Sequence, residues 1–155
     1  MRAYVQNTFQ LVWSTERREP VLDSAGSRRL YPYILKLLEN KRSKGFAIGG
    51  VEDHLHLICF IHQSIAVADL IKDIKLATHD MIVADPTLFP LFRGWQRGYA
   101  AISYGIEARQ DLINYANRQR THHADTQSYR DELRQLLLDN LVDFSEEHFD
   151  KDINE

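Results

Sequence analysis

The pattern of apolar and polar positions predicts an alternation of short strands and longer helices. Four short apolar segments, rich in β-branched and aromatic residues, predict strands at 4–14, 46–50, 54–61 and 94–105. Apolar residues recur at helical spacing from about Ser27 to Lys44, where Gly45 ends the pattern. A second amphipathic stripe, for which Ser64 is a plausible N-cap, predicts a helix that Asp85-Pro86 ends.

The chain beyond residue 105 predicts further helices. Residues 108–120 have helical character, and Thr126 is a candidate cap for a last helix that ends near Asn140. The element order is then β-α-β-β-α-β followed by helices, which is the ferredoxin-like order. We therefore expect an α+β fold with an antiparallel sheet, its first and third strands central, and both crossover helices on one face. Residues 1–155 should form one domain, with 141–155 as an acidic, partly loose tail.

Composition is that of a soluble globular protein, with 44% apolar and 26% charged residues. No segment has the pattern of a signal peptide, and no apolar run approaches the ~20 residues that a membrane span requires. The single cysteine, Cys59, cannot form an internal disulfide, and its apolar neighbours predict a buried, inert thiol. These features favour a reducing, cytoplasmic location.

Charge is unevenly distributed along the chain. Residues 1–130 carry a net charge of +4, whereas residues 131–155 carry −7. The acidic end therefore hides a mildly basic body. This balance is compatible with a nucleic-acid partner without by itself indicating one.

The sharpest local feature is His54-Leu55-His56 in a predicted central strand. Strand side chains alternate between faces, so His54 and His56 share one face while Leu55 points towards the predicted helices. Two adjacent imidazoles can bind one divalent cation, with further ligands from elsewhere. The alternative is a pair of half-exposed strand histidines without a ligand.

A second feature pairs Tyr115 with Gln119, which lie four residues apart and so on one stripe of a helix. A phenolate is a competent nucleophile towards phosphorus, although its pKa near 10 means that it needs a nearby metal or base. The alternative is that Tyr115 packs with Leu112 in the core. If this helix folds across the open face of the sheet, Gln119 can complete a His-His-Gln metal site.

Four motifs occur in order along nearly the whole chain: LVWST at 11–15 with Arg18 and PVL at 20–22, DHLHL at 53–57, Phe92 with WQRGY at 95–99, and YANRQ at 115–119 with His122-His123. With these motifs the chain resembles the IS200/IS605-like family of single-tyrosine (Y1) transposases, which belong to the HUH endonuclease superfamily. The order of the motifs is far more specific than any one of them.

The resemblance implies that His54, His56 and Gln119 bind Mg²⁺ or Mn²⁺ and that Tyr115 is the nucleophile. It implies cleavage and rejoining of single-stranded DNA beside hairpins at the ends of a mobile element, through a 5′-phosphotyrosine and a free 3′-OH. Members of the family are typically homodimers whose active sites are shared between subunits. Neither the target sequence nor the choice between one-subunit and shared sites follows from the sequence.

Several other residues are less readily assigned. Candidate phosphate contacts are Arg17, Arg18, Lys72 and Lys75, which could equally form a solvated surface. Glu52 stands where the family commonly has proline, so it either affects the metal or lies in an exposed turn. His122-His123 matches the family but has no assigned chemistry.

The sequence is also consistent with two other functions. The protein could be a domesticated relative that binds or processes repeated hairpins in a host genome. It could also be a non-catalytic ferredoxin-like module that binds nucleic acid, although the retained histidines, tyrosine and glutamine count against that.

Overall fold

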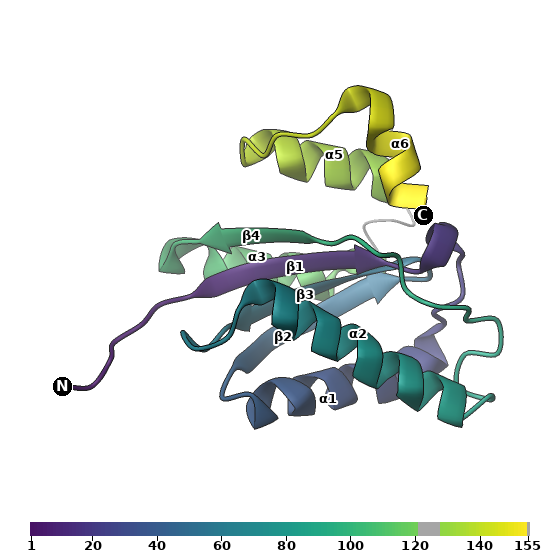
Figure 1. Cartoon of the computed structure of the whole chain (residues 1–155), viewed down its shortest axis with the longest axis horizontal. Coiled ribbons are helices and arrows are strands. Elements are labelled where there is room, and N and C mark those ends of the chain that lie inside the picture. The colour runs from purple at the N-terminus through teal and green to yellow at the C-terminus, as the bar shows by residue number, and fades with distance from the viewer. Residues whose placement is uncertain (121–127, 155) are drawn as a thin grey trace.

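An antiparallel sheet of four strands organises the chain (Figure 1). The computed structural model describes residues 1–120 and 128–154. The strands run in the order β2-β3-β1-β4, which is the expected ferredoxin-like order with the first and third strands central. Their bounds are β1 Thr8–Ser14, β2 Lys44–Val51, β3 His54–Phe60 and β4 Ala100–Tyr104.

Helices cover both faces of this sheet. The crossover helices α1 (Ser24–Asn40) and α2 (Val67–Ala84) lie together on one face, as predicted (Figure 1). The other face carries α3 (Arg109–Asn117), α5 (Tyr129–Asp139) and α6 (Glu146–Asn154). Two short 3₁₀ turns, η1 (Glu16–Arg18) and η2 (Ile106–Ala108), follow β1 and β4. No described helix is both long and apolar enough to cross a membrane.

The main core lies between the sheet and the two crossover helices. Alternation along β3 sends Leu55, Leu57 and Cys59 into this core, where each is fully buried. Burying one leucine side chain contributes roughly 1.5–3 kcal/mol, so a register slip in β3 is strongly disfavoured. The thiol of Cys59 is buried, as expected, and this burial raises its pKa to about 12.

Two helix starts differ from the sequence predictions. Helix α1 begins at Ser24 because Asp23 caps it, accepting a 2.6 Å hydrogen bond from the amide of Gly26. The predicted N-cap of α2, Ser64, is wrong: Ala66 occupies that position without a side-chain cap. The Ser64 hydroxyl lies instead 2.7 Å from Nδ1 of His62, within the preceding turn.

The predicted strands at 4–14 and 94–105 are both shorter in the structure, and in each case the N-terminal part is lost. Strand β4 begins only at Ala100, because the Lys75 ammonium group takes the carbonyl oxygens of residues 96, 97 and 98 at 2.7, 3.2 and 2.7 Å. Those carbonyls therefore bond to a side chain of α2. Trp95 keeps one bridge, to Thr15.

The C-terminal part is more helical than its sequence suggests. Helix α5 ends at Asp139, close to the prediction, but it is capped by Ser128, and Thr126 lies outside the described residues. Residues 141–155, expected to be partly loose, include helix α6. Its Phe149 and Ile153 are buried in a second core that α5 and α6 form against Val12 and Ala100 of the sheet.

Candidate active site

The histidine pair lies on the face of β3 opposite the main core, as the alternation predicts. His54 and His56 are 0% and 1% exposed, so the picture of two half-exposed strand histidines is wrong. Their ring centroids are 5.2 Å apart. Buried imidazoles need partners for both nitrogens, and each ring has them.

One nitrogen of each ring is held by a fixed acceptor. Nδ1 of His54 lies 2.7 Å from a carboxylate oxygen of Asp53, and Nδ1 of His56 lies 2.8 Å from the amide oxygen of Gln10 on β1. Because these oxygens only accept, each Nδ1 carries the hydrogen. Both Nε2 atoms then face the same space, where a neutral imidazole held in this way would offer its lone pair to a metal. Gln10 is therefore a positioning residue that the sequence patterns did not indicate.

Helix α3 packs directly over this face, and Gly49 of β2 allows it to do so. Gly49 pairs with His56 in the sheet, and a Cβ built on Gly49 would lie 1.8 Å from the backbone oxygen of Ala116. Only glycine therefore admits the helix this close. Ala116 is the neighbour of Tyr115, whose ring lies against His56 with centroids 5.6 Å apart. The expected placement of this helix across the open face is what the structure has.

Gln119 also reaches the site, although not as part of one continuous helix. Helix α3 ends at Asn117 rather than at residue 120, since Arg118 leaves helical geometry with φ −103° and ψ 10°. Gln119 is nonetheless 1% exposed, and its amide oxygen lies 3.3 Å from Nε2 of His54. The structure thus brings together Tyr115, both histidines and Gln119 of one chain.

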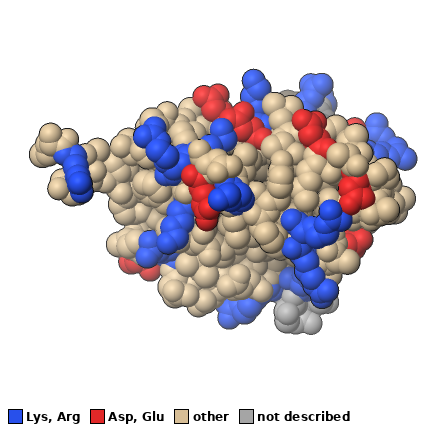
Figure 2. Space-filling view, turned by 90° about the horizontal axis from the view of Figure 1, so that it is seen from below, with Lys and Arg blue, Asp and Glu red and all other residues tan. Residues whose placement is uncertain are grey.

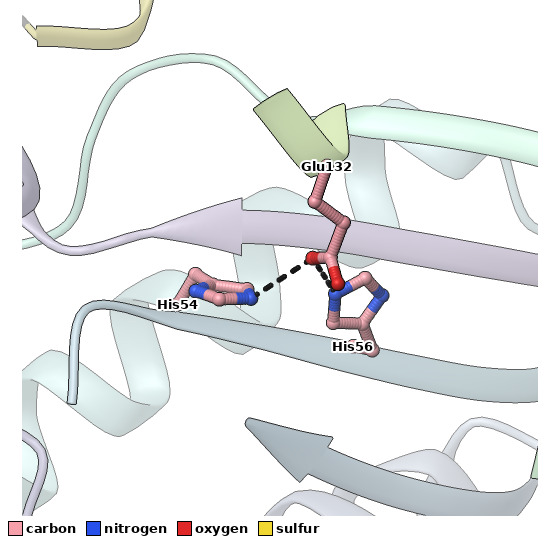
Figure 3. Close-up of side chains that lie close together, drawn as sticks. All are labelled: His54, His56 and Glu132. Carbon is pink, nitrogen blue, oxygen red and sulfur yellow. Dashed lines mark hydrogen bonds and ion pairs between the residues drawn. The ribbon is translucent and has the colours of Figure 1, made fainter. Parts of the chain in front are cut away.

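A fifth residue, Glu132 of α5, occupies the centre of the site and was missed by sequence reasoning (Figure 3). Its Oε1 lies 2.7 Å from Nε2 of His56 and 3.1 Å from Nε2 of His54. Its Oε2 accepts a hydrogen bond from the Tyr115 hydroxyl and another, at 3.3 Å, from the Gln119 amide. One signal could have found it: Glu132 shares the buried stripe of α5 with Tyr129 and Leu133, where an acid is out of place.

The electrostatics of the site favour the protonated forms of His54 and Tyr115. Burial lowers the pKa of His54, but its hydrogen bonds with Asp53 and Glu132 outweigh that and raise it to about 9. Burial, and then the bond to Glu132, raise the pKa of Tyr115 well above its usual value. Tyr115 is therefore a protonated phenol in this arrangement, and it needs a change at the site before it can act as a nucleophile.

The donor set suits a divalent cation. One atom each from His54, His56 and Glu132 lie within 4.8 Å of one another, all from buried residues. Imidazole nitrogens combined with carboxylate and amide oxygens form a mixed set that Mn²⁺ and Mg²⁺ accept. A pocket of about 250 Å³ leads from solvent to His56, Tyr115 and Glu132, between α3 and α5.

The predicted phosphate-binding residues are not gathered at this site. Lys72 and Lys75 lie on α2, across the sheet from the histidines, and the Lys75 ammonium group is already engaged by three carbonyls. Arg17 is exposed within η1, whereas Arg18 donates to Asn154 of α6 at 2.8 Å. On the face with α1 and α2, basic groups are interspersed with acidic ones (Figure 2).

Glu52, which stands where the family commonly has proline, lies outside the cluster of His54, His56 and Glu132. It lies in the turn between β2 and β3, where its carboxylate pairs with Arg120 at 2.8 Å. Arg120 also bonds the carbonyl of Leu22, so Glu52 helps to fix the segment that follows α3. His122-His123 lies outside the described residues.

Comparisons with known proteins agree with this architecture. Residues 3–119 match the family model described as "Transposase IS200 like". A solved structure from Deinococcus radiodurans R1, assigned as a transposase, is 23% identical with a TM-score of 0.59, covering 77% of this chain and 95% of its own. A REP-associated tyrosine transposase bound to a REP hairpin is 16% identical with a TM-score of 0.59, covering 84% and 77%. No curated protein sequence matches the chain.

The fold and the site define a ferredoxin-like domain in which the sheet face under α3 and α5 carries a histidine pair and an adjacent tyrosine. With three quarters of its length matching the family model, the chain belongs to the IS200-like transposase family. The two solved structures support the fold.

Proposed function

We propose that this transposase is a metal-dependent single-stranded-DNA endonuclease and strand transferase with Tyr115 as its nucleophile. One observation carries the proposal: the Tyr115 hydroxyl lies in the same buried cluster as both histidines, through its bond to Glu132. The alternative from sequence was a tyrosine that only fills the core. Such a residue would not need its hydroxyl beside two histidines and a carboxylate. We place this activity in the cytoplasm, on single-stranded DNA with hairpin ends.

In the proposed reaction the phenolic oxygen of Tyr115 attacks the scissile phosphorus. The phenol loses its proton as the bond from that oxygen to phosphorus forms, the bond from phosphorus to the 3′ oxygen breaks, and the 3′ oxygen takes up a proton as it leaves as a free 3′-OH. The 5′ phosphate stays on Tyr115 until another 3′-OH attacks it and rejoins the strands. The pocket beside Tyr115 is the route by which the phosphate reaches the hydroxyl.

The cofactor in this proposal is Mg²⁺ or Mn²⁺, held by His54 and His56 with Gln119 beside them. When bound, the cation polarises the scissile phosphate and stabilises the charge that develops on it. Asp53 and Gln10 hold the two imidazoles in the tautomer that the cation requires. Helix α3 keeps the tyrosine against them.

The family expectation was a homodimer with active sites shared between subunits. In this chain Tyr115 and the histidines of the same subunit already meet, and α3 is packed tightly enough for only glycine to fit at position 49. We therefore propose that one subunit supplies a whole site, whether or not the protein dimerises.

The proposed function is tested by incubating the protein with hairpin-bearing single-stranded oligonucleotides and Mg²⁺ or Mn²⁺. A covalent protein–DNA adduct on a denaturing gel is expected from the wild type and none from Tyr115→Phe. His54→Ala should bind the hairpin but not cut it. An adduct that persists in Tyr115→Phe would exclude this nucleophile, and no adduct with any cognate end would leave a binding role.

A second candidate is a host-adapted relative that processes repeated hairpins. The specific observation in its favour is the fold shared with a protein whose structure holds a REP hairpin. The two candidates share the chemistry and differ in the substrate. Cleavage assays that compare oligonucleotides from repeated palindromes with oligonucleotides from the gene's own flanks separate them.

A further inference from the structure

Glu132 is the residue at this site for which the family motifs provide no role. It comes from α5, which lies beyond the 3–119 segment that matches the family model. The residue is only 6% exposed, and a buried carboxylate is costly unless its oxygens are satisfied. Here both oxygens have partners, so the side chain is built into the site.

The position of α5 over the site is fixed by contacts of its own. Ser128 caps the helix by accepting a hydrogen bond from the amide of Asp131. The ring of Tyr129 stacks on the imidazole of His54, with centroids 4.5 Å apart and planes 28° from parallel. Glu132 is therefore held in place by packing as well as by its own hydrogen bonds.

The spacing of its Oε1 is that of a metal ligand. In an octahedral site with bonds of about 2.1 Å, neighbouring ligand atoms lie about 3 Å apart. Oε1 is 2.7 Å from Nε2 of His56 and 3.1 Å from Nε2 of His54, so one oxygen has ligand spacing to both histidines. The amide oxygen of Gln119 lies 3.3 Å from Nε2 of His54, farther than Oε1 of Glu132.

We propose that Glu132 is a ligand of the metal in this transposase, forming a His54–His56–Glu132 set with Gln119 as its neighbour. This inference rests on the proposed function only for the identity of the cation. A carboxylate brings the negative charge that Mg²⁺ and Mn²⁺ prefer and that neutral imidazole and amide groups lack. Because Oε2 bonds the Tyr115 hydroxyl, one side chain also connects the metal to the nucleophile.

The experiment is a calorimetric titration of the full-length protein with MnCl₂, without DNA. Glu132→Gln keeps the shape and removes the charge, and it should weaken Mn²⁺ binding by at least about tenfold, since even outer partners of a ligand matter 10–100-fold. Asp131→Asn is the matched control: it removes the same charge from an exposed neighbour on the same helix and should leave affinity within about twofold. Circular dichroism verifies that each variant is folded. If Glu132→Gln does not fold, Glu132→Asp is titrated in its place.

The outcomes separate the alternatives. Unchanged affinity in Glu132→Gln, with a loss in Gln119→Ala, overturns the proposal and returns the ligand role to Gln119. Tighter binding in Glu132→Gln also overturns it, because Glu132 would then compete with the cation. Mn²⁺ binding that depends on Glu132, in a protein that forms no DNA adduct, upholds this ligand and rejects the proposed function.

Discussion

Replacing Gly49 with alanine tests whether the close packing of α3 on the sheet positions Tyr115, the proposed nucleophile. The new Cβ would lie 1.8 Å from the Ala116 oxygen, and Cβ contacts below 3.0 Å are essentially not found, so the backbone must separate by about 1.2 Å. The obstructing atom belongs to a helix backbone and cannot rotate away. Tyr115, the adjacent residue, must move with it.

A displacement of this size has a definite kinetic consequence. Misplacing a reacting group by about 1 Å can cost about 100-fold in rate. We therefore expect Gly49→Ala to reduce the single-turnover rate of adduct formation about 100-fold. Overpacking costs about 1–3 kcal/mol, less than the 5–15 kcal/mol by which typical domains are stable, so the variant should stay folded. Mn²⁺ affinity should change little, because its ligands do not lie on α3.

The assay measures adduct formation at saturating hairpin oligonucleotide, beside thermal unfolding and a Mn²⁺ titration. Gly98→Ala is the matched control, since its Cβ would have no atom within 4 Å, and it should behave as wild type in all three measurements. If Gly49→Ala forms adduct at the wild-type rate while folded, the packing of α3 in this subunit does not set the reaction geometry.

Three further predictions follow from the same contacts. Mixing His54→Ala protein with Tyr115→Phe protein should give no more adduct than either alone if one subunit holds the whole site; restored cleavage would establish shared sites. In metal-free protein kept in chelator, the pKa of His54 is raised from 6.5 to about 9. This shift contributes at most about 3 kcal/mol to the free energy of unfolding, fully below pH 6.5 and progressively less as the pH rises through 9. Thermal unfolding should show this decline in stability with pH, and the decline should be smaller in His54→Ala. Gln10→Leu removes the acceptor of His56 and should weaken Mn²⁺ about 10–100-fold, whereas Tyr104→Phe, which removes only the far partner of Gln10, should bind Mn²⁺ normally.

The sequence predicts the sheet and the histidine face well because both follow from alternation. In β3, Leu55 and Leu57 enter the core, and that alone places His54 and His56 on the other face. Contacts between residues far apart in the chain could not be predicted from the sequence pattern. The strand expected at 94–105 is shortened because Lys75, some twenty residues earlier, captures the carbonyls of 96–98, and no local pattern reports that contact.

Glu132 and α6 show the same limit in the C-terminal segment. A net charge of −7 over 131–155 favours a solvated tail, yet the apolar residues Phe149 and Ile153 recur four apart and bury one face of a short helix. Within that acidic segment, Glu132 differs from its neighbours only by its place in the buried stripe of α5. Composition does not distinguish buried acids from exposed ones, so it could not identify Glu132 as the acid that reaches both histidines.

The proposed ligand atoms and the proposed nucleophile are brought together by three separate packing events. Pairing of β1 with β3 places Gln10 behind His56, the glycine at position 49 admits α3, and the Tyr129 ring stacks α5 onto His54. Each event can be removed by one substitution without touching the other two. If the site is a single cooperative unit, Gln10→Leu combined with Glu132→Gln should lower Mn²⁺ affinity by less than the product of the single effects, because both act through the same cation.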